Sequence, residues 1–228
     1  MLSIDKFVQW QTTSLEALFH GTTHAWEALD NIDAWLKRQL NSPGVRILGT
    51  VQPGAFVDKD VIVGRGSVIE AGACVKGPAY IGSHTEVRHG AYLRAGSVVG
   101  NGCVIGHASE IKASILLDGS AASHFNYVGD SILGKHSNLG AGVKLSNVKH
   151  TKTEIVLSCE DEKFHTGRVK LGAVIGDYVN LGCGVITNPG TLIGPGTLVY
   201  PNAVLRGVYP GESIIKVTLQ LEVVQKRN

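Results

Sequence analysis

Large aliphatic residues recur every six positions through most of this 228-residue chain. The longest unbroken run has twelve members: Val51, Val57, Val63, Ile69, Val75, Ile81, Val87, Leu93, Val99, Ile105, Ile111 and Leu117. After a slip the period resumes at Tyr127, Leu133, Leu139 and Leu145, and it returns at Ile175, Leu181, Thr187, Ile193, Val199 and Leu205. A period of six is neither helical nor the alternation of an ordinary strand. It predicts a parallel β-helix built from hexapeptides.

Each hexad would supply one short strand and one corner, and three hexads would close a triangular coil of about 18 residues. The aliphatic residue points into the prism, and glycine and polar residues suit the corners. Because one hexad cannot bury its own apolar side, stability must come from stacking between coils. A glycine- and valine-rich β-sandwich is the alternative, but sandwiches do not keep one period over so long a stretch. Chains with this hexad resemble the left-handed β-helix family, so we expect left-handed coils.

Three segments depart from the hexad. Residues 1–44 form an expected N-terminal cap, in which 24–40 have helical spacing and should cover the open end of the prism. The β-helix should occupy 45–211, with a polar insertion at 149–170 that we interpret as a functional excursion. Residues 212–228 should form a terminal strand and tail, because the apolar residues there alternate.

The composition excludes several classes of protein. The net charge is +2, which favours neither nucleic acid nor a membrane surface as a partner. The chain has no apolar run of membrane-spanning length and no signal-peptide pattern. The four cysteines form no CxxC pair, so a cytoplasmic location is expected: Cys74, Cys103, Cys159 and Cys183.

Two groups of histidines are candidates for chemistry. His84 and His89 have the spacing of two zinc ligands in γ-class carbonic anhydrases, which this chain resembles only in part. A catalytic zinc site prefers three protein ligands, and no third histidine lies between His24 and His84. Solvent-facing corner residues are therefore the favoured interpretation. His124 lies where the hexad slips, and a histidine exposed there could act as a general base near neutral pH.

The segment around His124 carries a family resemblance. SHFNYVGDSILGKHSNLGAG resembles the G-H-x-x-Y-x-G-D … N-x-G-A-G block of acetyltransferase domains. These domains occur in bifunctional N-acetylglucosamine-1-phosphate uridyltransferase/glucosamine-1-phosphate N-acetyltransferases and in related archaeal sugar-1-phosphate nucleotidyltransferases. The resemblance covers about residues 24–210, but no nucleotidyltransferase domain is expected here. Ser123 replaces the usual glycine, and Val148 stands where bacterial members have tyrosine.

The resemblance implies acetyl-CoA-dependent N-acetylation of an amino-sugar 1-phosphate in sugar-nucleotide and cell-envelope precursor synthesis. It assigns the general base to His124 and its orientation to Asn147. Substrate binding falls to Arg94, Lys112, Tyr127 and Asn138, and to a loop lysine, for which Lys152 and Lys149 are both candidates. Acetyl-CoA would contact Ala141 and Gly142, the proposed oxyanion donors, as well as Gly182, Cys183 and Arg206; Arg168 or Lys170 could meet its phosphates.

The resemblance also implies a homotrimer that requires no metal, and a separate nucleotidyltransferase as a further partner. A non-catalytic oligomerisation or regulatory scaffold is the main alternative. The γ-class zinc enzyme is the second alternative. Retention of all six polar residues at family spacing favours the enzyme, because a scaffold needs only the hexads.

Overall fold

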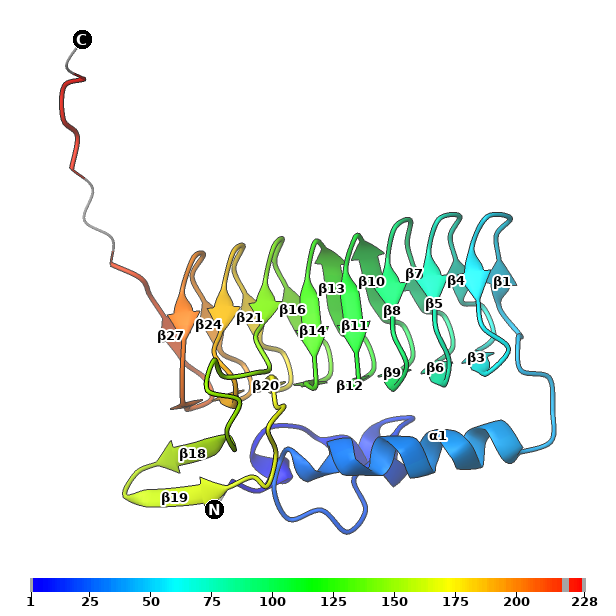
Figure 1. The fold of residues 1–228 in the computed structure, drawn as a ribbon, viewed down its shortest axis with the longest axis horizontal. Helices are drawn as coiled ribbons and strands as arrows, with labels where there is room; N and C mark the ends of the chain where they lie inside the picture. The colour runs from blue at the N-terminus through cyan, green and yellow to red at the C-terminus, as the bar shows by residue number, and fades with distance from the viewer. Residues whose placement is uncertain (1, 219–221, 227–228) are drawn as a thin grey trace.

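A computed structural model describes residues 2–218 and 222–226, and it shows a three-walled prism of parallel strands (Figure 1). The predicted all-β, left-handed parallel β-helix is confirmed: successive coils in Figure 1 wind in the left-handed sense. Each coil gives one strand to each wall, so neighbouring strands are three apart in sequence, or five apart across the insertion. None of the helices in the described residues is long and apolar enough to cross a membrane.

The walls are named here in the order in which the chain meets them. The first wall contains β1 (Thr50–Val51), β4 (Val68–Ile69), β7 (Glu86–Val87), β10 (Val104–His107), β13 (Ala121–His124), β16 (Asn138–Leu139), β21 (Asn180–Leu181), β24 (Leu198–Val199) and β27 (Ile214–Ile215). The second wall contains β2 (Phe56–Val57), β5 (Cys74–Val75), β8 (Tyr92–Leu93), β11 (Glu110–Lys112), β14 (Tyr127–Gly129), β17 (Lys144–Leu145), β22 (Ile186–Thr187) and β25 (Val204–Leu205). The third wall contains β3 (Val61–Val63), β6 (Ala79–Ile81), β9 (Ser97–Val99), β12 (Ser114–Leu116), β15 (Ile132–Leu133), β20 (Ala173–Ile175), β23 (Thr191–Ile193) and β26 (Val208–Tyr209).

The hexad residues stack inside the prism as one core, with two exceptions at the register slip. Leu116 and Val128 occupy the prism core, so the predicted core positions Leu117 and Tyr127 are wrong by one residue each. Two corners between the second and third walls are each one residue shorter than a regular hexad. The backbone turns there through Ala113 and Asp130, whose φ angles are 44° and 48°. This shortening rotates Tyr127 out of the core and onto the surface of the second wall.

The N-terminal segment covers the third wall along its length, rather than the open end of the prism as predicted (Figure 1). Short 3₁₀ turns lead into a helix: η1 (Ile4–Lys6), η2 (Trp10–Thr12), η3 (Glu16–Leu18), η4 (Glu27–Asn31) and α1 (Ile32–Asn41). The predicted helix at 24–40 is therefore α-helical only from Ile32 onward.

A second core joins this segment to the third wall. The middle residue of successive strands on that wall points outward and is apolar: Val98, Ile115, Ile132, Val174 and Leu192 are each 0% exposed. Trp26, Leu29 and Leu36 of the N-terminal segment pack in the same cluster. The wall already carried these apolar residues, so covering it removes more apolar surface from water than covering one end would.

The insertion forms an antiparallel hairpin of β18 (Val156–Cys159) and β19 (Glu162–His165). Its Ile155 and Leu157 are buried in the second core, and Arg168 forms an ion pair with Asp30 of the N-terminal segment. The hairpin thus extends the cover over the third wall. The predicted terminal strand is limited to Ile214–Ile215 among the described residues, and 219–221 lie outside them.

Candidate functional site

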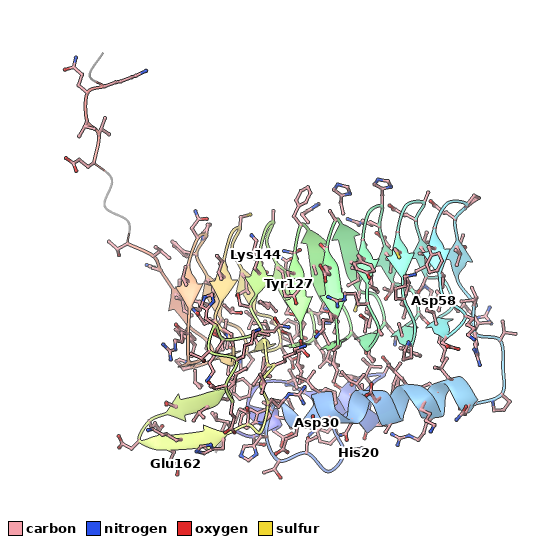
Figure 2. The ribbon with its side chains drawn as sticks, viewed as in Figure 1. His20, Asp30, Asp58, Tyr127, Lys144 and Glu162 are labelled. Atoms are coloured by element: carbon pink, nitrogen blue, oxygen red, sulfur yellow. The ribbon has the colours of Figure 1, made fainter. Side chains whose placement is uncertain are left out.

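The second wall gathers four of the predicted site residues on its outer surface. Arg94 follows β8, Lys112 ends β11, Tyr127 begins β14, and Asn147 lies just beyond β17. Neighbouring strands are in register, with Glu110 opposite Tyr127 and Lys112 opposite Gly129. Figure 2 shows Tyr127 and Lys144 on adjacent strands of this wall. The spacing of the sequence motif therefore becomes one continuous polar patch.

Both cations of this patch are paired with carboxylates. Arg94 Nη1 lies 2.9 Å from Glu110 Oε1, and Lys112 Nζ lies 2.7 Å from Asp130 Oδ2. Sequence reasoning assigned no role to Glu110 or Asp130. Glu110 could have been found from the sequence, because it lies two residues before Lys112 and residues two apart on a strand share a face. The patch is therefore a charge-balanced cluster of two ion pairs.

Tyr127 and Asn147 meet above Gly129. A Cβ atom placed on Gly129 would lie 2.6 Å from Tyr127 Oη and 2.8 Å from Asn147 Nδ2, so the glycine leaves room for both polar groups. Burial raises the pKa of the Tyr127 phenol above its ordinary value, and the carboxylates of Glu110 and Asp130 raise it further. The hydroxyl therefore stays protonated at neutral pH and can donate a hydrogen bond to an anion.

Gly129→Ala should separate Tyr127 from Asn147, because the added methyl group would occupy the space where their polar atoms meet. We expect the KM for an anionic ligand bound by these two groups to rise about tenfold, the cost of about one displaced hydrogen bond to a charged group. Steady-state kinetics would measure this rise. Gly64→Ala is the matched control, because the added Cβ would also be crowded, 2.5 Å from Gly82 C, but in a coil that carries none of the patch residues. An unchanged KM in Gly129→Ala would contradict the proposed contact.

His124 ends β13 at the corner between the first and second walls, a line that we call the ridge. Its side chain is exposed, and its backbone is fixed on both sides. The N–H donates to Asn126 Oδ1 at 3.0 Å, and the carbonyl accepts from Gly142 N at 2.9 Å. Asn126 is 2% exposed and also donates to the Gly140 carbonyl at 2.7 Å. This buried amide, which sequence reasoning missed, sets the corner that presents the imidazole.

Four of the residues predicted to contact acetyl-CoA continue along the ridge from His124: Ala141, Gly142, Gly182 and Cys183. The coils are linked there, since Gly184 N donates to the Ala141 carbonyl at 2.8 Å. The N–H of Gly142 is already bonded to the His124 carbonyl, so Gly142 cannot supply the predicted oxyanion donor. Ala141 remains the candidate for that role. A Cβ atom placed on Gly142 would meet nothing within 4 Å, whereas one on Gly182 would lie 2.6 Å from Pro201 N, so open space is found at Gly142.

Other predicted residues lie apart from this group. Asn138 is exposed on β16 of the first wall, the opposite side of the ridge from Tyr127. Lys152 is exposed in a turn at the start of the insertion, and in the described part of the chain no ion pair joins it to the patch. Arg206 is exposed beyond β25 of the second wall. Arg168 is engaged with Asp30, so it is not free for CoA phosphates.

Asn147 does not orient His124 as the resemblance implied. Its amide donates instead to Asp130 Oδ2 at 2.5 Å, on the second wall. The imidazole therefore stands at the ridge while the amide belongs to the patch. The predicted pairing is wrong for the structure of a single chain, and Asn126, two residues after His124, is the residue that fixes its backbone.

The histidines considered as metal ligands lie on turns at the surface. His89 Nδ1 lies 2.8 Å from the Ala71 carbonyl, and its ring stacks on that of His107 with centroids 5.6 Å apart. Across residues 2–218 and 222–226, no group of three or more His, Cys, Asp or Glu residues has an arrangement that could hold a metal ion. These contacts agree with the interpretation of corner residues.

Fold and sequence together define a hexapeptide-repeat β-helix protein with a polar patch beside a ridge histidine. The family described as GMPPB C-terminal domain matches residues 75–188, half of the chain, and includes the whole patch. The chain belongs to this family.

Two curated relatives confirm the resemblance seen in the sequence. A bifunctional protein GlmU of Methanococcus maripaludis is 35% identical over 214 residues, which are 94% of this chain and 51% of that protein. The bifunctional sugar-1-phosphate nucleotidylyltransferase/acetyltransferase of Sulfurisphaera tokodaii is 36% identical over 104 residues, 45% of this chain and 26% of that protein. The chain thus spans about half the length of the GlmU relative and about a quarter of the length of the second relative. Among solved structures, the acetyltransferase domain of PglB from Neisseria gonorrhoeae is 17% identical, with 86% of this chain and 71% of that chain covered and a TM-score of 0.33.

Proposed function

We propose that this chain catalyses the acetyl-CoA-dependent N-acetylation of an amino-sugar 1-phosphate. The observation that carries the proposal is the patch of Arg94, Lys112, Tyr127 and Asn147 on one wall, next to the corner that presents His124. One curated relative is named as a bifunctional sugar-1-phosphate nucleotidylyltransferase/acetyltransferase, which supports an acetyl transfer in sugar-phosphate chemistry. A scaffold would need neither the paired cations nor the exposed imidazole.

In the proposed reaction the substrate ammonium first loses one proton to solvent. The free amine then attacks the thioester carbonyl carbon, forming the C–N bond, while His124 accepts the second nitrogen proton. The developing oxyanion would be held by the Ala141 N–H. Collapse breaks the C–S bond, and the imidazolium returns its proton to the CoA sulfur. The products are the N-acetyl sugar phosphate and CoA thiol, without a covalent intermediate on the protein.

Arg94, Lys112 and the Tyr127 hydroxyl would hold the phosphate. Phosphate oxygens accept from guanidinium, ammonium and phenol donors, and a planar guanidinium can bind two of them. The hydrogen bond to Glu110 raises the pKa of Arg94, so its positive charge is secure at any working pH. Phosphate would then share Arg94 with Glu110 and Lys112 with Asp130.

We further propose that the active unit is a homotrimer that uses the ridge and its two adjoining walls. The N-terminal segment covers the third wall, which leaves the first and second walls for neighbours. Asn138 and Tyr127 lie on different walls of one chain, so a neighbouring copy could bring an Asn138 to a given patch. A closed ring of three needs one such heterologous contact repeated. Light scattering that gave the mass of a single chain would contradict this arrangement.

The function is tested by thiol release from acetyl-CoA with a panel of amino-sugar phosphates. Glucosamine 1-phosphate should be acetylated, and glucose 1-phosphate, which lacks the amine, should release no thiol. A non-catalytic scaffold would release none with any substrate. Adding a sugar nucleotidyltransferase to the assay would show whether the acetylated product is passed to a separate enzyme.

Arg94→Ala should raise the KM for the sugar phosphate about tenfold and lower kcat less. The guanidinium would contact phosphate equally in the ground and transition states, and its loss also leaves the Glu110 carboxylate unpaired beside the anion. Arg46→Ala is the matched control, because Arg46 is also exposed and paired, 3.5 Å from Asp60, at the far end of the prism. Equal KM values for the two variants would remove Arg94 from the phosphate site.

A further inference from the structure

Asp130 occupies an unusual place beside the patch. It lies at the second shortened corner, its φ is 48°, and only 5% of the residue is exposed. An isolated carboxylate in such a position would be costly to bury, so its bonding partners matter. Two such partners contact the Asp130 carboxylate, and they come from different coils.

Both partners are predicted site residues: the family resemblance assigns Lys112 to substrate binding and Asn147 to the orientation of His124. Lys112 Nζ donates to Asp130 Oδ2 at 2.7 Å, and Asn147 Nδ2 donates to the same oxygen at 2.5 Å. The lysine comes from the coil before Asp130 and the asparagine from the coil after it. One buried oxygen therefore fixes the positions of two side chains that would otherwise be free to rotate.

The backbone of Asp130 also holds the base of the insertion. Its carbonyl accepts from Gly172 N at 2.8 Å, where the chain re-enters the prism, and its N–H donates to the Lys112 carbonyl at 2.9 Å. Leu171 N in turn donates to the Asn147 carbonyl at 3.0 Å. The two ends of the insertion are thus tied to the residue that orders the patch.

We infer that Asp130 is a positioning residue, which aligns the Lys112 ammonium and the Asn147 amide for the sugar phosphate without touching the substrate itself. This inference rests on the proposed function. Its Oδ2 already accepts from these two donors, and only 5% of the residue is exposed. Its effect on the substrate must pass through Lys112 and Asn147, and Asn147 in turn lies against Tyr127.

The test is a double-mutant cycle between Asp130→Asn and Lys112→Gln, with KM and kcat measured for glucosamine 1-phosphate. Asparagine tolerates a positive φ and keeps the size of the side chain, but its amide cannot accept both bonds in the same way. We expect Asp130→Asn to raise KM about tenfold and to change kcat less. In the double variant the rise should be no larger than that of Lys112→Gln alone, because the two residues act as a unit.

Asp177→Asn is the matched control. Asp177 is 3% exposed and also accepts two hydrogen bonds at 2.7 Å, from Gln9 N and Lys135 N, but these lie towards the N-terminal segment. Whatever this change does to the melting temperature, the KM should stay that of the unmodified protein. If Asp130→Asn does not fold, Asp130→Gly replaces it, since glycine adopts the same φ without strain.

Three outcomes are informative. A non-additive rise in KM supports the inference. Additive rises, or a fall in the active fraction with KM unchanged, would overturn it and leave a purely structural aspartate. If the unmodified protein releases no thiol with any substrate of the panel, the proposed function fails first, and the inference that rests on it fails too.

Discussion

Replacing His124 with alanine should lower kcat for amino-sugar acetylation by about 10²–10⁴-fold, the usual contribution of a positioned proton acceptor. The KM should change little, because the base acts mainly in the transition state. The fold should be preserved: the imidazole is exposed, and the corner is held by the backbone bonds of His124 to Asn126 and Gly142, which alanine keeps. Thiol-release kinetics on the folded variant would measure the loss.

His107→Ala is the control for this prediction. His107 lies directly opposite His124 on the neighbouring strand β10, is likewise exposed, and has its Nδ1 2.8 Å from the His89 carbonyl. Its loss should leave kcat within a few-fold of the unmodified protein. A zinc enzyme would instead lose activity in His84→Ala or His89→Ala. Near-full activity of His124→Ala would show that the base is another group, however well the motif matches.

Replacing Trp35 with alanine should reduce the free energy of unfolding by about 3–5 kcal/mol, the usual cost of removing a large buried aromatic side chain. Trp35 belongs to α1 and is 4% exposed, and its ring packs edge-on against Tyr80 of the third wall with centroids 5.0 Å apart. Chemical denaturation would measure the loss. Activity per folded molecule should be retained, because α1 covers the wall that carries none of the predicted site residues.

Chemical denaturation also distinguishes a helix α1 that lies along the third wall from one that lies across the end of the prism. If α1 lies along the wall, Trp35→Ala and Tyr80→Ala should show a coupling of about 0.5–1.5 kcal/mol in a double-mutant cycle. A helix across the end of the prism would leave Trp35 and Tyr80 independent. Trp10→Ala is the control, because Trp10 is only half-buried and stacks on Phe19 within the N-terminal segment. Its loss should be smaller and uncoupled from Tyr80.

The period of six does not reveal which residues point into the core on either side of the register slip. The hexad places Leu117 and Tyr127 in the core, yet Leu116 and Val128 lie there. Each shortened corner has one residue fewer than a regular hexad, and the period of six does not show which corners are short. Ser114 and Ser131 link the shortened corners to the following coils: the Ser114 hydroxyl accepts from Ser131 N, and the Ser131 hydroxyl accepts from Ala173 N, both at 3.0 Å.

The period of six in the sequence is enough to predict the three-walled prism. Twelve aliphatic residues in strict period have only one way to become buried together, so the β-helix and its core follow from spacing and the hydrophobic effect. The family resemblance, and not the period, indicated Arg94, Lys112 and Tyr127 as substrate residues, and it paired Asn147 with His124 instead of with them.

The use of the outer surfaces depends on how the coils stack in three dimensions. The outward residues from Tyr80 to Leu192 recur once per coil, and they become a continuous apolar wall only after the coils stack, which is why the N-terminal segment covers a side and not an end. The hydrogen-bond partners of Lys112 and Asn147 also depend on the tertiary structure. Asp130 reaches Lys112 and Asn147 because a corner is one residue short, and no local pattern specifies which donors a buried carboxylate will meet.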